Sequence, residues 1–224
     1  MRKGEEKRQE LLNAAEKLFC ARGYEGASVQ DILTAAGMSK GGFYHHFASK
    51  EDVMKALCAR RAERLAAYAE DLLDAAATPM ERINAVLHGF MPLRREEAAF
   101  MAMLLPVIGT QEGRAIAMTY QDALEEYFRP MLTAEIAAAA AVEVVCPPVK
   151  DVESIILNIV NQCWMSAAAL INSADRQSID RLTLLNLLTK YRRAIEVLLD
   201  APYGSVEIIR VEEWDETVSR IRNV

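Results

Sequence analysis

The sequence predicts an all-α protein in two parts, on the evidence of its composition, its helix-cap patterns and its charge distribution. Of 224 residues, 52% are hydrophobic, whereas only 10 are glycine and 7 are proline. This composition favours helices around a sizeable core. Residues 1–64 hold 12 Lys and Arg against 9 Asp and Glu, a net charge of +3, while residues 65–224 hold 14 against 23, a net charge of −9. We therefore expect a basic head on an acidic body.

The head is expected to begin with an amphipathic helix over Glu5–Arg22. Its apolar residues recur at spacings of three and four, and Gly23 then ends it. A second helix is predicted to start at Ser28, because Asp31 stands three residues later, as in a capping box. Gly37 ends this helix after two turns.

A third short helix is predicted from its cap, Ser39, to about Phe47. Two short helices joined by a tight glycine turn describe a helix-turn-helix. Gly41 and Gly42 are unexpected in such a helix, because each costs about 1 kcal/mol relative to alanine. We interpret them as positions where the helix backbone comes close to DNA, with Phe43 and Phe47 facing a small core.

Lysine and histidine side chains lie on this third helix and just after it. Ser49 is the expected cap of a long fourth helix, and Lys40 and Lys50 lie at or beside helix starts, where phosphate groups bind. His45 and His46 are adjacent, and neighbouring helical side chains diverge by about 100°. The pair therefore favours contact with DNA or a helix cap over metal ligation.

The run "SVQDILTAAGMSKGGFYHHFASKEDVMKAL", Ser28–Leu57, resembles the DNA-binding signature of the tetracycline-repressor (TetR) family of bacterial transcription regulators. The preceding "LLNAAEKLFCARGYEGAS" fits the same family. The resemblance implies a homodimer whose third helix enters the major groove of a palindromic operator. It also implies contacts with double-stranded DNA by Ser28, Ser39, Lys40, Gly41, Gly42, Tyr44, His45, His46 and Lys50.

One position departs from the family pattern, since many relatives carry a second small residue with a side chain where this chain has Gly42. Without side chains at Gly41 and Gly42, base readout is expected to depend on Lys40, His45 and Gln30. The chain alone does not predict the operator sequence.

The body is expected to contain about six helices, counting the fourth, with breaks where Pro, Gly, Asn or Ser cluster. Pro130 should kink or split the helix that contains it. We predict a DNA-binding domain over 1–48, an effector-binding and dimerisation domain over 49–204, and a C-terminal extension over 205–224 that carries a short helix.

A small-molecule pocket in the body is expected chiefly because the family resemblance implies one. Large aromatic and methionine side chains gather in several body segments, and most of them are core residues. Methionine also adapts to varied ligands, and apolar pockets between helices are common binding sites. The predicted lining is His88, Met91, Phe100, Met103, Leu104, Tyr120, Leu124, Asn161, Trp164 and Met165.

The last two long helices carry apolar faces and small residues. Ordinary packing within one chain explains these faces, and the resemblance implies instead that they form a four-helix interface between two copies. The residues predicted for that interface are Ala168, Leu182, Leu185, Leu188, Arg192 and Ile195.

Other function classes receive less support from the sequence. There is no apolar run after the initial charges and none long enough to span a bilayer, so we expect a cytoplasmic protein without a membrane partner. The four cysteines form no CxxC pair and are interpreted as small buried hydrophobes, and no cofactor or metal is expected. Recognised catalytic motifs are absent, so no catalytic residue is predicted. An enzyme and a helical interaction module without DNA binding remain as alternatives.

Overall fold

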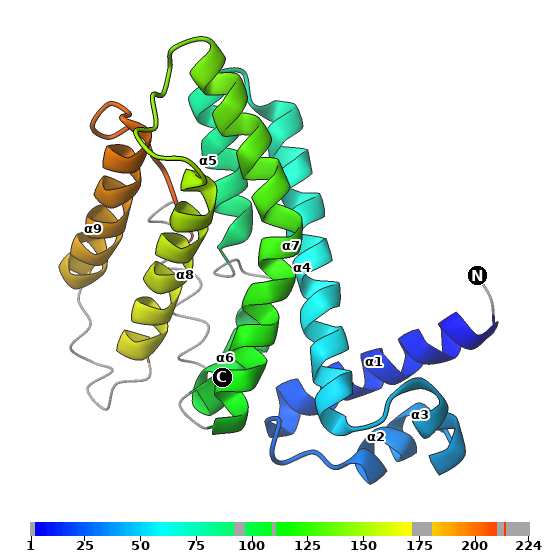
Figure 1. Cartoon of the computed structure of the whole chain (residues 1–224). Helices are drawn as coiled ribbons and strands as arrows, with labels where there is room; N and C mark the ends of the chain where they lie inside the picture. The colour runs from blue at the N-terminus through cyan, green and yellow to red at the C-terminus, as the bar shows by residue number, and fades with distance from the viewer. Residues whose placement is uncertain (1–2, 92–96, 109–110, 172–180, 210–212, 214–224) are drawn as a thin grey trace.

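The computed structural model describes residues 3–91, 97–108, 111–171, 181–209 and 213. All regular elements in these ranges are helices, which confirms the predicted fold class. Figure 1 shows α1, α2 and α3 gathered at one end of α4, with the other helices forming a larger body. The helices are α1 (Lys3–Arg22), α2 (Val29–Ala36), α3 (Lys40–His46), α4 (Lys50–Ala75), α5 (Pro79–Phe90), α6 (Ala98–Ile108), α7 (Gln111–Ala141), α8 (Val152–Ile171) and α9 (Arg181–Leu199).

The helix ends in the head follow the predicted cap patterns. The Ser28 side chain accepts a hydrogen bond from the Asp31 amide at 3.1 Å, and the Ser28 amide donates to the Asp31 carboxylate at 2.8 Å. Gly23 and Gly37 have φ values of 77° and 60°, in the left-handed region that glycine adopts most readily. The Ser49 side chain caps α4 by accepting a hydrogen bond from the Asp52 amide at 3.1 Å. Local sequence therefore fixes where these helices begin and end.

The core of the head is apolar, as the sequence predicted. Phe43 and Phe47 are both buried, and Phe19 on α1 is fully buried with them in the core. The Arg8 guanidinium lies over the Phe47 ring, 5.0 Å from its centroid, and so links α1 to the end of α3. The exposed side of α3 is left for other contacts.

The body is built on three helices that pack together, α4, α5 and α7, with α8 and α9 paired beside them. α4 and α5 approach closely at Gly89, because a Cβ added there would lie 2.4 Å from the Cβ of Ala69. Phe128 on α7 fills the adjacent space and packs edge-on against Phe90, with ring centroids 5.3 Å apart.

Pro130 was expected to kink or split its helix, and the structure contradicts the split. α7 continues across Pro130 as one helix of 31 residues. Proline removes one backbone donor, so the carbonyl of residue 126 loses its usual helical partner. Both Glu126 and Pro130 are exposed, so the proline lies on the solvent side of α7, where an unpaired carbonyl costs little.

The chain beyond α9 is anchored to the body. The Asn84 side chain on α5 donates to the Ser205 carbonyl and accepts from the Glu207 amide, both at 2.9 Å. Glu196, which is fully buried on α9, accepts from the Gly204 amide at 2.7 Å. The apolar side chains in this segment that enter the core are Val206, Ile208 and Ile209. The helix predicted near 211–221 lies outside the described residues, apart from residue 213.

Candidate DNA-binding surface and effector cavity

The residues predicted to contact DNA lie around α3 and the start of α2. The Ser39 side chain caps α3 by accepting from the Gly42 amide at 3.2 Å. Because Phe43 on α3 and Phe47 just after it are buried in the core, Tyr44 points outward and is 51% exposed. Seven of the ten residues predicted to contact DNA are exposed, namely Ser28, Gln30, Ser39, Lys40, Gly41, Tyr44 and His45. The other three, Gly42, His46 and Lys50, are half-buried.

The two glycines of α3 have different surroundings. A Cβ on Gly41 would meet no atom of the chain within 4 Å. A Cβ on Gly42 would lie 2.9 Å from Cγ of Met38, a flexible side chain that packs against this turn. Packing within the chain therefore explains part of the choice of glycine at Gly42 but none of it at Gly41.

Lys50 is more engaged within the head than its predicted role requires. Its ammonium donates to the Tyr24 carbonyl at 3.1 Å and lies 4.1 Å from the centroid of the Tyr24 ring. Glu25 lies 4.0 Å away. Lys50 therefore ties the start of α4 to the loop after α1, and Lys40 is the freer cation beside α3.

The histidines of α3 and the cysteines have different surroundings. The rings of His45 and His46 are 5.0 Å apart, and no group of three or more metal-ligating side chains occurs among the described residues. Cys58 and Cys163 are buried, and burial raises the pKa of each thiol to about 12. Cys20 is half-buried and Cys146 is exposed, which corrects the expectation that all four cysteines are buried.

A cavity of about 280 Å³ lies between α6, α7 and α8. Apolar and aromatic side chains form most of its wall, and amide side chains and Arg114 form its polar part. Six of the ten residues predicted for a pocket line it, namely Leu104, Tyr120, Leu124, Asn161, Trp164 and Met165. Gln162, a polar residue beside the predicted Asn161, lines it as well, and the residues that the sequence did not indicate are Arg114, Ala117, Met118 and Gln121.

The missed residues on α7 carried a detectable signal. Ala117 and Gln121 precede the predicted Leu124 at spacings of four and three, so the three residues lie on one face of α7. The Asn161 side chain donates to Gln121 at 3.0 Å and joins α8 to α7 beside the cavity. Helical periodicity would therefore have found the cavity face of α7.

The other four predicted pocket residues lie elsewhere. Met91, Phe100 and Met103 are buried in the core and do not line this cavity. His88 lines a different hollow of about 420 Å³ between α4, α5 and the C-terminal segment. Its Nε2 lies 2.9 Å from the Glu213 carboxylate. The sequence could not separate these residues, because all of them are apolar or histidine positions on helical core faces.

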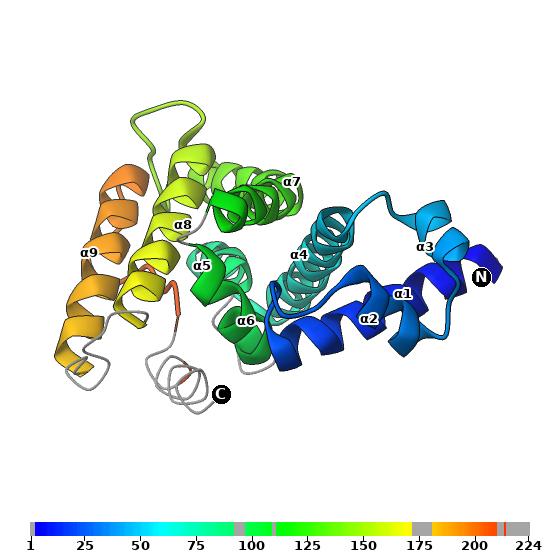
Figure 2. The ribbon, with the colours of Figure 1, turned by 90° about the horizontal axis from the view of Figure 1, so that it is seen from below.

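A buried charge cluster joins the head to the body, and the sequence analysis did not predict it. Arg61 on α4 is 5% exposed and forms ion pairs with Glu16 on α1, at 2.9 Å, and with Glu97. Arg60 pairs with the other oxygen of Glu16 at 2.7 Å. The Arg61 guanidinium also stacks on Phe100 of α6, 4.2 Å from the ring centroid. Figure 2 shows α6 beside the end of α1, where this cluster lies.

The predicted dimer residues differ in exposure. Leu182 is 63% exposed, and Leu185, Leu188 and Arg192 are half-buried. Ile195 is fully buried within the chain, on a helix that packs against α8. The Ala168 side chain lies outside the described part.

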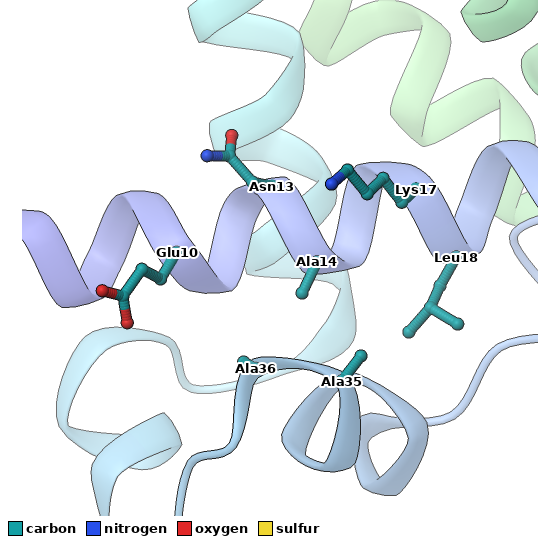
Figure 3. A pocket seen from close by; sticks show the side chains of 7 residues that line it. All are labelled: Glu10, Asn13, Ala14, Lys17, Leu18, Ala35 and Ala36. Carbon is teal, nitrogen blue, oxygen red and sulfur yellow. The ribbon is translucent and has the colours of Figure 1, made fainter.

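A shallow groove of about 440 Å³ lies on the head between α1 and α2 (Figure 3). Ala14 and Leu18 on α1 face Ala35 and Ala36 on α2 across it. Polar side chains of α1, including Lys17, stand at its edge. Three of the four residues that face each other across the groove are alanines, whose short side chains leave this space unfilled.

The comparisons with known proteins agree with this architecture. Residues 11–57 match the model of "Bacterial regulatory proteins, tetR family". The HTH-type transcriptional repressor KstR2 of Mycobacterium tuberculosis is 30% identical over 146 residues, which cover 58% of this chain and 73% of KstR2. The chain belongs to the TetR family. AcnR of Corynebacterium glutamicum, a transcriptional repressor, is 44% identical over 59 residues, 26% of this chain and 31% of AcnR.

Solved structures show the same fold over most of the chain. A putative TetR-family regulator from Rhodococcus sp. superposes with a TM-score of 0.58 at 17% identity, covering 87% of this chain and 99% of that one. Salmonella enterica GusR gives a TM-score of 0.57 at 19% identity, covering 87% and 96%. This TetR-family member is thus a DNA-binding transcription regulator, and its relatives are regulators rather than enzymes. In the described ranges, no helix combines the length and apolarity needed to cross a bilayer.

Proposed function

We propose that this TetR-family protein is a ligand-responsive repressor that binds a palindromic operator as a homodimer and is released by a small molecule. One observation carries the DNA-binding part: α3 buries Phe43 in the head and leaves Lys40, Gly41, Tyr44 and His45 exposed on its other side. Lys40 supplies positive charge for phosphate, and Gly41 offers open backbone for close approach. In this proposal residues 1–48 read the DNA.

The dimer is supported by the dimensions of DNA and by α9. Two recognition helices must lie about 34 Å apart to enter successive major grooves. The exposed Leu182 and the half-buried Leu185 and Leu188 lie along α9, beside α8. Apolar side chains on the outer face of a helix pair are suited to a second copy of the same pair. Ile195 takes no part, since it is buried in its own chain.

The cavity between α7 and α8 is the proposed effector site. Its volume of about 280 Å³ is near the lower end of small-molecule sites. Leu124, Trp164 and Met165 favour an apolar body, and Gln121 and Asn161 offer hydrogen bonds to a polar group. A small, largely apolar molecule with one or two polar groups fits this lining. RolR, a structural neighbour with a TM-score of 0.55, was solved with resorcinol bound.

Release of DNA requires the effector to favour one arrangement of the two heads over the other. A ligand that binds both arrangements equally shifts nothing. α4 begins in the head and packs on α5 and α7 in the body, so it carries displacement from the cavity to the head. Residues 49–204 combine effector binding and dimerisation in this proposal.

The first experiment is selection of bound sequences from a random duplex-DNA pool near physiological salt. We expect a palindrome whose half-sites lie about one helical turn, roughly 34 Å, apart. Absence of enrichment, together with no salt-dependent affinity for duplex DNA, would favour the helical interaction module instead.

The Gly41→Ala variant then tests the role of α3 on the selected operator. Added Cβ meets nothing within the chain, so folding stability should stay equal or rise by up to about 1 kcal/mol. Operator affinity should nevertheless fall. Gly4→Ala is the matched control, because Gly4 is also helical and a Cβ there meets nothing within 4 Å. Unchanged affinity in Gly41→Ala would contradict close approach of α3 to DNA.

A further inference from the structure

Tyr120 belongs to both the cavity and the charge cluster at the junction of head and body. Its ring is part of the cavity wall between α7 and α8. The same ring packs edge-on against Phe100, with ring centroids 5.9 Å apart. The Arg61 guanidinium stacks on the face of the Phe100 ring. Two ring contacts therefore lead from the cavity wall to Arg61.

The Tyr120 hydroxyl is buried and has no hydrogen-bond partner among the described residues. Burial and the charge of Glu97 raise its pKa well above the usual value, and the charge of Arg61 opposes them. The hydroxyl is therefore neutral and lies within the field of the Arg61–Glu97 pair. Arg61 Nε is also buried without a partner in the described part of the chain. A donor and an acceptor thus remain unpaired in one cluster, an arrangement that a small displacement improves.

Arg61 holds α1 through Glu16, and this contact is the connection to the head. Glu16 shares its two oxygens between Arg60 and Arg61 at 2.7 and 2.9 Å. The pair with Arg61 is well shielded, since the two side chains are 6% and 23% exposed. Salt and water screen such a pair less than they screen a surface pair. A change in the direction of the Arg61 guanidinium therefore acts on α1 directly, without passing through the rest of α4.

We propose that Tyr120 couples occupancy of the α7–α8 cavity to the position of α1, by bringing its hydroxyl to Arg61 and loosening the Arg61–Glu16 pair. This proposal deepens the proposed function and rests on it for the effector. A molecule in the cavity presses on the Tyr120 ring, and the hydroxyl moves to the unpaired Nε of Arg61. Because the guanidinium is planar and rigid, turning Nε toward the hydroxyl also turns the nitrogen that pairs with Glu16. The Arg61–Glu16 pair then weakens and holds α1 less firmly, and the head leaves the DNA-binding arrangement.

The test fills the cavity by mutation, so no effector has to be known. Ala117→Phe places a ring among the lining residues, and Ala117→Leu is a milder second variant if the first fails to fold. The chain has two tryptophans, Trp164 and Trp214, and Trp164 lines the cavity. In a Trp214→Phe background the fluorescence therefore comes from Trp164 alone and reports whether the cavity is filled. Hydrogen–deuterium exchange of full-length protein then measures protection of the α1 amides around Glu16.

We expect the filled variants to exchange faster around Glu16 and to bind the selected operator about tenfold more weakly. Adding Tyr120→Phe keeps the ring in the wall and removes only the hydroxyl, so both responses to filling should disappear. Tyr127→Phe is the matched control on the same helix. Tyr127 is 37% exposed and lies outside both the cavity and the cluster, so both responses to filling should persist in this variant.

Two results would overturn the proposal. One is a response to filling that survives in the Tyr120→Phe background, and the other is unchanged exchange around Glu16 in a variant whose fluorescence shows a filled cavity. Failure of the proposed function looks different. In that case the random pool yields no operator, and the exchange response of α1, with its loss in Tyr120→Phe, is still measured.

Discussion

The proposed DNA-contacting surface and the effector cavity are built in opposite ways. The surface comes from one short stretch, with Ser39, Lys40 and Tyr44 within six positions of one another, and its side chains point away from the core. The cavity combines residues as distant as Leu104 and Met165, and its wall is continuous with the core. Substitutions of the exposed side chains that cap no helix, such as Lys40 and Tyr44, should therefore change binding and leave folding intact, whereas substitutions near the cavity should change folding as well.

The largest effect is expected from Phe128→Ala in the body. Phe128 is fully buried against Phe90 and beside Gly89, so removing its ring leaves a cavity and should lower the free energy of unfolding by about 3–5 kcal/mol. Chemical denaturation measures this loss. The neighbouring Tyr127→Ala is the control, because Tyr127 is 37% exposed. Equal losses in the two variants would show that the body core is not where the structure places it.

Gly89→Ala tests the close approach of α4 and α5. The new Cβ would lie 2.4 Å from Cβ and 3.0 Å from Cα of Ala69, so the helices must separate. We expect a loss of about 1–3 kcal/mol in the free energy of unfolding. Thermal or denaturant unfolding measures it, with Gly4→Ala as control at an open helical position. A neutral Gly89→Ala would mean that α4 and α5 move apart freely.

Lys40→Ala tests whether the proposed DNA-contacting surface binds phosphate. Lys40 is exposed at the start of α3, so folding stability should not change, while operator binding should weaken by about 1 kcal/mol and the slope of log affinity against log salt should fall by about 1. Fluorescence anisotropy across a salt series measures both. Lys190→Ala on α9 is the matched exposed control. An unchanged slope would remove Lys40 from the phosphate contacts.

Ser28→Ala removes the cap of α2. The Ser28 side chain accepts from the Asp31 amide, so its loss should cost about 1 kcal/mol of folding stability. The effect should be confined to the head, which hydrogen exchange of α2 amides would show. Thr34→Ala on the same helix is the control, expected to stay within about 0.5 kcal/mol of the wild type. A larger loss in Thr34→Ala than in Ser28→Ala would contradict the capping role.

The smallest effect concerns pH. Hydrogen bonds from Ser28, aided by Arg22, hold the pKa of Asp31 below its usual value of 3.8. Because the folded pKa is the lower one, Asp31 stabilises the head above the unfolded pKa, and this contribution is lost as pH falls through the folded pKa. Unfolding titrations from pH 6 to pH 2 should therefore show a smaller decline in Asp31→Asn than in the wild type. Parallel declines would mean that the capping box does not distinguish the charged carboxylate.

The sequence by itself determined the head to a large extent. The Ser28 and Asp31 capping box, the Ser39 and Ser49 caps and the stops at Gly23 and Gly37 act between residues close in the chain, so their effect is legible without a structure. The burial of Phe43 and Phe47 followed from their spacing of four. The family signature lies in the same stretch.

Only the tertiary structure decided which body residues share a cavity and which fill the core. His88, Met91, Phe100 and Met103 have the same chemical character as the lining residues, and their positions depend on how helices far apart in sequence pack. The pairs of Arg61 with Glu16 and Glu97 span 45 and 36 residues. No local sequence pattern predicts these ion pairs, because the packing of distant helices decides which charged side chains are buried next to each other. A buried charge needs such a partner.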